Sequence, residues 1–128
     1  MRVLLDTCAA LWWWSGDARL PHGVAAFLGD SDNDVRFHQA SYLEITIKYG
    51  LGKLPLNGLP SVLIPKALDA YRVGYSALGN RDIARLETLP WHHRDPFDRL
   101  LIAHALENQL TVVTADRTFA GYGVPVFW

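Results

Sequence analysis

Short apolar runs alternate along the chain with longer segments of helical periodicity. The first run, Val3–Leu5, is fully apolar and ends at the carboxylate of Asp6, which is typical of a buried central strand in a parallel sheet. Runs of similar length predict further strands at 35–37, 71–75, 110–114 and 124–128. Because strands that alternate with helices indicate an α/β fold, we expect one domain over residues 1–128. Its core should be a central parallel sheet of about four to five strands flanked by helices.

Helices are predicted in the intervals between these strands, at 7–15, 21–29, 41–50, 61–70, 80–89 and from 96 onward. Gly16 lies where the first helix should end. Ser41, followed three residues later by Glu44, fits a capping box at the start of the third helix. Pro65 lies inside the fourth segment and predicts a late start or a kink there.

The clearest helix follows Asp95. Asp95 suits the N-cap position, and Pro96 suits the first helical position. Apolar residues occupy most sides of this helix, so we expect it to be buried: Leu100, Leu101, Ala103, Ala105 and Leu106.

Composition limits the class of protein. Hydrophobic residues make up 50% of the chain and charged residues 20%, the balance of a globular domain without a disordered tail. The longest apolar stretch, Ala9–Trp14, is far too short to span a membrane, and no signal peptide is visible. A single cysteine excludes an internal disulfide and suits a reducing compartment, so we expect a cytoplasmic protein. At a formal net charge of −1, binding of nucleic acid would require a local basic patch.

Four acids are predicted to meet at one edge of the sheet. Asp6 and Asp116 each follow a strand, and Glu44 and Asp98 each lie in the predicted first turn of a helix. The carboxyl ends of parallel strands and the helix N-termini that follow them share one edge. Carboxylates crowded there would repel one another unless a counter-charge were present. A Mg²⁺ or Mn²⁺ ion would supply it, because hard divalent cations bind oxygen ligands.

Helix capping is the alternative explanation for three of the acids at this edge. Taken singly, Glu44, Asp95 and Asp98 are better explained as residues that stabilise helix N-termini. Asp6, at the end of a buried strand, has no comparably obvious capping role. Four acids at one predicted edge together favour a metal site.

Four motifs in chain order carry a resemblance to a known family: Leu4-Leu5-Asp6-Thr7, Ser41-x-x-Glu44-Ile45-x-Ile47-Lys48, Asp95-Pro96-Phe97-Asp98-Arg99-Leu100-Leu101-Ile102-Ala103 and Val113-Thr114-x-Asp116. They resemble a PIN-domain ribonuclease and, more narrowly, the VapC toxins of bacterial toxin–antitoxin pairs. The resemblance covers essentially the whole chain, at the expected spacing. Any one motif would be weak, and the four together are specific.

The resemblance implies both a site and a function. It makes Asp6, Glu44, Asp98 and Asp116 the metal-binding and catalytic acids, with Mg²⁺ or Mn²⁺ as the cofactor, and Asp95 the helix cap. The implied reaction is metal-dependent hydrolysis of phosphodiester bonds in single-stranded RNA, with products that end in 5′-phosphate and 3′-hydroxyl. It also implies a toxin that inhibits translation, a cognate antitoxin that blocks the site, and a homodimer. Thr114 matches the family's small hydroxyl residue near the fourth acid.

Two other functions are compatible with parts of this pattern. A phosphatase of the haloacid-dehalogenase type also has an Asp after its first strand, but it requires a second Asp two residues later, where this chain has Cys8. A non-catalytic RNA- or protein-binding module would keep the acids only as helix caps. Metal-dependent cleavage of single-stranded RNA distinguishes the nuclease from such a module.

Histidine, cysteine and basic residues near the acids have structural alternatives. His92 and His93 lack the spacing of a zinc site and could contact RNA, while His104 and Cys8 read as packing residues, Cys8 as a small buried one. Basic residues beside the acids could bind phosphates or pair with the carboxylates: Lys48, Arg94, Arg99 and Arg117.

Three tryptophans follow one another at positions 12–14 of the first helix. Because they span about 200° of a helix, they can hardly face the core equally. We expect at least one of them at a surface that contacts the antitoxin or a second subunit, where Trp is enriched.

Overall fold

One parallel sheet of five strands organises the chain, in a computed structural model that describes residues 1–128. The strand order is β3-β2-β1-β4-β5, and every neighbouring pair is parallel. The strands are β1 Arg2–Leu5, β2 Asp34–His38, β3 Gly74–Ser76, β4 Thr111–Val113 and β5 Val126–Phe127. The predicted α/β class and the central position of the first apolar run are confirmed.

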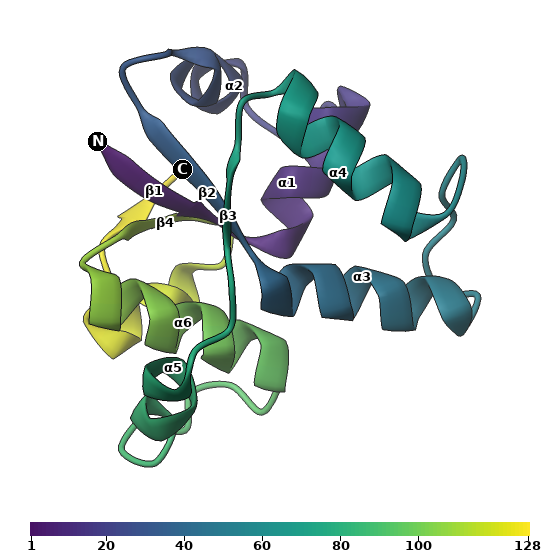
Figure 1. Cartoon of the computed structure of the whole chain (residues 1–128). Helices are drawn as coiled ribbons and strands as arrows, with labels where there is room; N and C mark the ends of the chain where they lie inside the picture. Colours follow the sequence, from purple (N-terminus) through teal and green to yellow (C-terminus); the bar gives the residue numbers. More distant parts are fainter.

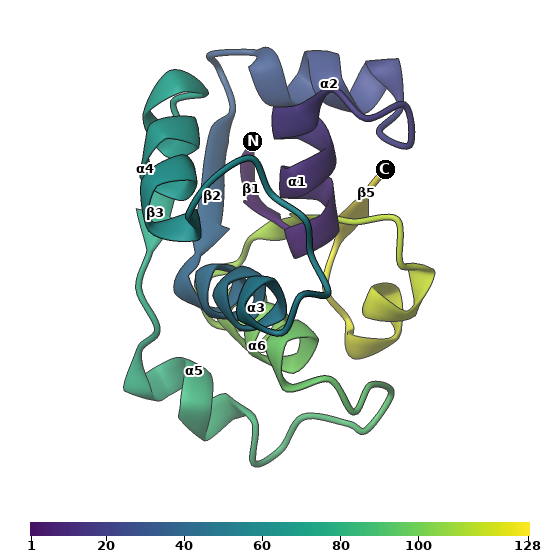
Figure 2. The same ribbon diagram turned by 90° about the vertical axis from the view of Figure 1, so that its right-hand side faces the viewer.

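Helices cover both faces of the sheet. The helices are α1 Thr7–Ser15, α2 His22–Gly29, α3 Gln39–Gly50, α4 Pro60–Ala70, α5 Asn80–Arg85 and α6 Pro96–Asn108, and a 3₁₀ helix η1 spans Arg117–Tyr122. Figures 1 and 2 show α1 and α4 on one side of the sheet and α5 and α6 on the other.

Side chains of β1 alternate between two hydrophobic cores. Val3 and Leu5 belong to a cluster built with α1, α2 and α4, whereas Leu4 belongs to a second cluster built with α6 and η1. All three side chains are fully buried, as the period of two residues in a strand requires. The first apolar run is therefore the centre of the fold because it packs against both layers of helices.

The start of α3 differs from the prediction. The helix begins at Gln39 rather than Ser41, because the Nδ1 atom of His38 accepts a hydrogen bond from the Ala40 N–H at 2.9 Å and caps the helix. Ser41 instead accepts a hydrogen bond from the Thr7 hydroxyl at 2.8 Å. The predicted capping box is therefore wrong, and Glu44 lies in the second turn of the helix rather than the first. The Ser41–Thr7 contact joins the start of α3 to the start of α1.

Other element boundaries shift by a few residues. Helix α4 begins early, at Pro60 in the first helical position, and continues through Pro65, so the late start predicted there is wrong. Strand β3 begins only at Gly74, after Arg72 adopts a left-handed conformation with φ of 55°. Helix α5 ends at Arg85, short of the predicted 89. Helix α1 ends as predicted, at Gly16 with φ of 68°.

Helix α6 confirms its predicted cap. The Asp95 carboxylate accepts hydrogen bonds from the N–H groups of Phe97 at 2.8 Å and Asp98 at 3.4 Å. Arg99, one turn further along, is buried and donates to the carbonyl oxygens of Pro90 at 2.6 Å and Leu89 at 3.2 Å. The guanidinium therefore fastens the preceding loop to α6 and is not free to bind a phosphate.

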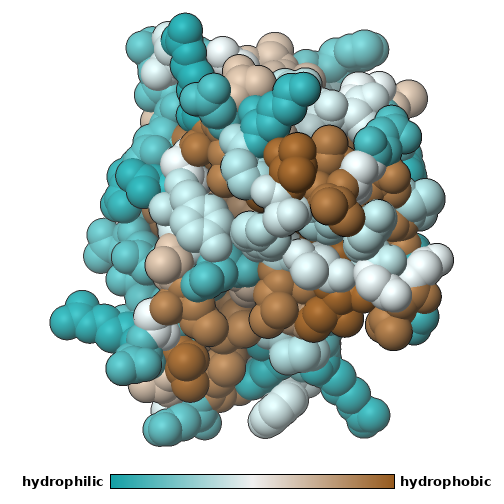
Figure 3. All heavy atoms as spheres, turned by 45° about the vertical axis from the view of Figure 1, so that its right-hand side comes forward, coloured by the Kyte–Doolittle hydropathy of each residue, from teal (hydrophilic) through white to brown (hydrophobic).

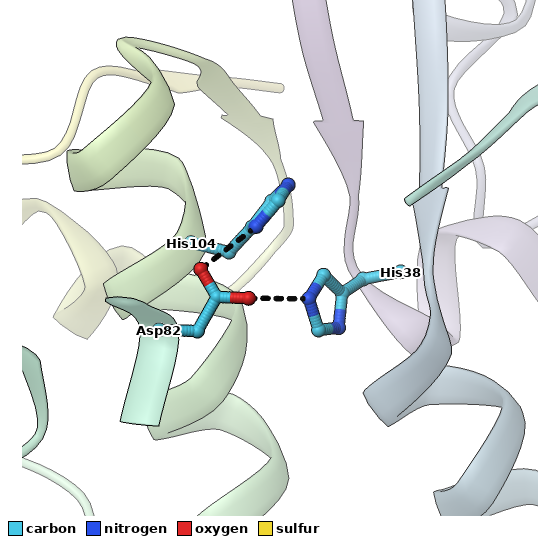
Figure 4. Close-up of side chains that lie close together, drawn as sticks. All are labelled: His38, Asp82 and His104. Carbon is cyan, nitrogen blue, oxygen red and sulfur yellow. Dashed lines mark hydrogen bonds and ion pairs between the residues drawn. The ribbon is translucent and has the colours of Figure 1, made fainter. Parts of the chain in front are cut away.

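A buried polar network joins the end of β2 to α5 and α6 (Figure 4). The carboxylate of Asp82 on α5 lies between His38 Nε2 at 3.2 Å and His104 Nδ1 at 3.0 Å. It also accepts from the Gly79 N–H at 3.0 Å. Burial alone would raise the pKa of Asp82, but these hydrogen bonds lower it, so the carboxyl is ionised at neutral pH. We call these three side chains, His38, Asp82 and His104, the clasp.

Removing the carboxylate of the clasp should destabilise the fold. In Asp82→Ala both imidazoles lose their partner where water has little access, and each unsatisfied buried group costs about 1–3 kcal/mol. Urea denaturation should therefore show a lower free energy of unfolding. The matched control is Asp69→Ala, because Asp69 is exposed on α4 and its carboxylate forms no hydrogen bond or ion pair. Equal free energies of unfolding in the two variants would contradict a structural role for the clasp.

Candidate active site

The predicted acids meet at the point where the strand order reverses. Chain connections run from β1 to β2 and β3 on one side and to β4 and β5 on the other, so the carboxyl ends of β1 and β4 flank a topological switch point. In Figure 1, α1 and α3 begin beside the ends of β1 and β2. A cleft of about 400 Å³ opens there, lined among others by all four predicted acids: Asp6, Glu44, Asp98 and Asp116.

Thr114 links the two acids that follow strands. Its hydroxyl donates to Asp6 Oδ2 at 2.7 Å and accepts a hydrogen bond from the Asp116 N–H at 3.0 Å. Asp116 then caps η1, since its Oδ1 accepts from the Thr118 N–H at 2.9 Å. The buried Thr114 side chain thus sets the positions of Asp6 and Asp116 relative to each other.

Glu44 reaches the cleft from the second turn of α3. Its carboxylate is buried, and Oε2 pairs with Lys48 Nζ at 2.5 Å, one turn further along the helix. Oε1 is also buried and has no hydrogen-bond partner. A buried carboxylate oxygen without a donor is costly unless another group binds it.

Electrostatic crowding raises the pKa of two of the acids. Burial, followed by the charges of Asp95, Asp6 and Glu44, raises the pKa of Asp98 to about 7. Burial also raises the pKa of Asp6, and the charge of Glu44 adds to that effect. These shifts are those expected when several carboxylates share a partly buried site without a cation.

The pKa of Asp116, in contrast, is lowered. Burial would raise its pKa, but hydrogen bonds from His93 and Thr118 outweigh that effect and lower it. The contact with His93 joins Nε2 to Asp116 Oδ2 at 2.8 Å. The sequence placed His93 only in a loop near Asp95 and gave no indication of this partner.

Two groups of side chains place potential metal-binding atoms within 4.8 Å of one another. One, His93 with Asp98 and Asp116, belongs to the cleft, and the other is the clasp. A neutral imidazole carries one proton, and Nδ1 of His38 already accepts the Ala40 N–H. The proton therefore lies on Nε2, which has no lone pair for a metal. Burial and the adjacent His104 ring lower the pKa of His38, so the ring stays neutral, and we assign the clasp to structure.

Cys8 and the tryptophans also differ from expectation. Cys8 is exposed and lines the cleft, so its predicted burial is wrong: α1 places this position on its outer side, two residues after Asp6. All three tryptophans are partly buried against one core cluster, each beside its own aromatic neighbour: Trp12 with Trp128, Trp13 with Tyr71 and Trp14 with Phe37. Trp12 also lines the cleft. A role for any of them in partner binding stays a prediction.

The donor set of the cleft fits a divalent cation. It consists of carboxylate oxygens from four separate elements, and it includes the unpartnered Oε1 of Glu44. A cation would relieve the repulsion that raises the pKa of Asp98 and Asp6. Hard cations such as Mg²⁺ and Mn²⁺ prefer this kind of oxygen ligand.

Comparison with known proteins identifies the family and the fold. The family model described as PIN domain matches residues 3–124. Among solved structures, VapBC2 from Rickettsia felis, bound to a DNA fragment from its promoter, is similar with a TM-score of 0.71 at 15% identity, over 99% of this chain and 98% of that chain. FitAcB from Neisseria gonorrhoeae gives 0.65 at 22% identity, over 100% and 97% of the two chains. A toxin–antitoxin complex from Klebsiella pneumoniae gives 0.65 at 16%, over 98% and 96%. The search of curated proteins gives no match. None of the helices has the length and apolar character needed to span a membrane.

The pKa of Asp98 makes the stability of the metal-free protein depend on pH. Because the folded-state pKa of about 7 lies above the ordinary value of 3.8, the folded state binds more protons between these values. The free energy of unfolding should therefore fall as pH rises from about 4 to about 7, with a contribution of the same sign from Asp6.

Denaturant titrations in excess chelator measure this slope. Asp98→Asn should flatten it and be at least as stable as wild type at neutral pH. Asp116→Asn is the control, because the lowered pKa of that carboxyl keeps it ionised across the same range. If the free energy of unfolding of Asp98→Asn fell with pH as steeply as that of wild type, the raised pKa of Asp98 would be contradicted.

Proposed function

The chain belongs to the PIN domain family, and from this premise we propose that it is a Mg²⁺- or Mn²⁺-dependent endoribonuclease, the toxin of a VapBC-type toxin–antitoxin pair that inhibits translation. PIN domains are nucleases that generally use divalent metals. The observation that supports the proposal most is the convergence of Asp6, Glu44, Asp98 and Asp116 on one cleft at the switch point. Membership of the PIN domain family argues against the alternative of a haloacid-dehalogenase-type phosphatase.

We assign the four acids to binding of the metal ion. When bound, such an ion activates water and stabilises negative charge on the phosphate that is attacked. Thr114 holds Asp6 in place, and Lys48 holds one oxygen of Glu44 while the other faces no donor. One carboxylate that is not fully occupied by the ion would accept the proton of the attacking water.

We propose RNA as the substrate, and the surrounding charges support binding of its phosphates. Arg94 and Arg117 flank the acids in sequence, are exposed, and form no ion pair. Free guanidinium groups beside an acidic centre can hold the phosphates that the acids themselves would repel. Arg99, in contrast, is buried against carbonyl oxygens and is excluded from this role.

Cleavage of single-stranded RNA is the direct test. The purified protein should cut it with Mg²⁺ or Mn²⁺ and stop in excess EDTA. Asp6→Asn should lower the rate about 100-fold or more, the scale of removing one group that stabilises a transition state, while its melting behaviour stays that of a folded protein. The control is Asp32→Asn, since Asp32 is exposed and lies outside the cleft. Full activity in EDTA would contradict the metal dependence, and no activity with either metal would favour the non-catalytic module.

Protein partners form the second part of the proposal. The solved structures similar in fold include a toxin–antitoxin complex, which supports a cognate antitoxin for this chain, and we propose that the chain also forms a homodimer. Exposed apolar residues recur at one turn's spacing along α3 and into its C-cap, where Leu43, Ile47 and Leu51 are 48%, 42% and 63% exposed. Apolar groups also show at several places on the face in Figure 3. Surface of this kind fits protein contacts.

Trp12 is the anchor we assign to the antitoxin. It lines the acidic cleft, so a partner that blocks the cleft would cover its ring. Trp12→Ala should weaken antitoxin binding by about 2 kcal/mol or more, measured by calorimetry, with sedimentation to follow dimerisation. The matched control is Trp91→Ala, because Trp91 is 77% exposed and does not line the cleft. Unchanged affinity and dimerisation in a folded Trp12→Ala protein would show that this ring only packs.

A further inference from the structure

His93 is held from two sides in the loop that precedes α6. Its side chain is 12% exposed, and Nε2 lies 2.8 Å from Asp116 Oδ2. Nδ1 lies 3.1 Å from the Tyr122 hydroxyl, and the backbone N–H of His93 donates to the same hydroxyl at 2.7 Å. The ring stacks on Tyr122 at 5.5 Å between centroids and meets the edge of Phe119 at 5.2 Å. Packing and hydrogen bonds therefore fix the orientation of the imidazole.

These contacts determine which nitrogen carries the proton. The Tyr122 oxygen accepts the backbone N–H, so its own O–H is available to donate to Nδ1. The ionised Asp116 carboxylate can only accept, so a neutral imidazole carries its proton on Nε2 and leaves Nδ1 as the acceptor. That N–H then points at a carboxylate oxygen, which satisfies every polar atom in the chain from Tyr122 to Asp116.

We propose that His93 is a positioning residue of the metal centre, which orients the carboxylate of Asp116 through its Nε2–H and does not itself bind the ion. This inference rests on the proposed function, in which Asp116 is a metal-binding acid. Asp116 needs such support because its side chain is 40% exposed and stands beyond the end of β4. The Thr118 N–H holds Oδ1 and His93 holds Oδ2, so together they fix the rotation of the carboxylate.

A direct metal bond from His93 is the competing arrangement. It would require the proton to leave Nε2, and the hydrogen bond from Nε2 to Asp116 Oδ2 would be lost. Partners that hydrogen-bond to metal-binding side chains typically change metal affinity or activity by 10–100-fold when removed. The positioning role therefore predicts an effect of about that size without any nitrogen in the coordination sphere.

Three variants distinguish the effect of the His93 N–H donor from the effect of its aromatic ring. His93→Phe keeps an aromatic ring but no donor, and His93→Gln keeps an N–H donor near the position of Nε2. His92→Phe is the control, because the exposed His92 ring contacts Tyr122 edge-on at 4.8 Å but forms no hydrogen bond. Calorimetric titration with Mn²⁺ should show about 10–100-fold weaker binding for His93→Phe, recovery of most of the loss in His93→Gln, and no change in His92→Phe.

Two spectroscopic measurements test the mechanism rather than the affinity. Nitrogen-15 NMR of the metal-free protein should place the His93 proton on Nε2, and a proton on Nδ1 would overturn the proposal. Electron spin-echo spectra of the Mn²⁺ complex should show no coupling to a bound imidazole nitrogen. A coupling that is present in wild type and lost in His93→Phe would make His93 a ligand.

The outcomes distinguish this proposal from the one it rests on. Wild-type protein that neither binds Mn²⁺ nor cleaves RNA would defeat the proposed function and this role together. Wild-type binding with an equal affinity in folded His93→Phe would defeat the positioning role alone. If His93→Phe does not fold, Tyr122→Phe replaces it: loss of the hydroxyl should free the imidazole and weaken Mn²⁺ binding in the same direction, and unchanged binding would overturn the proposal.

Discussion

Repulsion among carboxylates at the end of β1 is the interaction to which the rest of this structure responds. The parallel sheet brings Asp6 and Asp116 to one edge, and α3 and α6 add Glu44 and Asp98. Burial, together with the charges of Asp95, Asp6 and Glu44, raises the pKa of Asp98 to about 7. A site of this kind lowers stability locally, and burial in the two apolar clusters on either side of the sheet offsets it.

Neighbouring side chains stabilise single oxygens of three of these acids by hydrogen bonds or an ion pair. Thr114 donates to Asp6, Lys48 pairs with Glu44, and His93 donates to Asp116. Asp98 receives no such donor, and it is the acid whose pKa is raised furthest into the neutral range. The donors thus fix the geometry of three acids while leaving charge for a cation to neutralise, which is the preorganisation that a metal site requires.

Sequence alone was sufficient for the features that depend on local chemistry. The apolar run ending at Asp6 and the Asp95-Pro96 start of α6 each express a strand or cap rule within a few residues, and both predictions are confirmed. The capping box at Ser41 failed because a histidine outside the usual capping residues supplied the acceptor. The contact of His93 with Asp116 spans 23 positions, and the clasp joins residues 44 positions apart. No periodicity or spacing rule reports which loop residue will face which carboxylate.

The two histidine–carboxylate pairs differ in how well they fit the proposed metal ion. His38 and His93 both point Nε2 at an aspartate, so the imidazoles alone do not distinguish the sites. The two sites differ in how many hydrogen bonds their carboxylates accept. Asp82 is buried, and its carboxylate accepts three hydrogen bonds, from His38 and Gly79 on Oδ2 and from His104 on Oδ1. Oδ2 of Asp116 has a single partner, and Asp116 lines a cleft shared with three other acids. These differences support our proposal of a cation at Asp116 rather than at Asp82, where protein donors already stabilise the carboxylate.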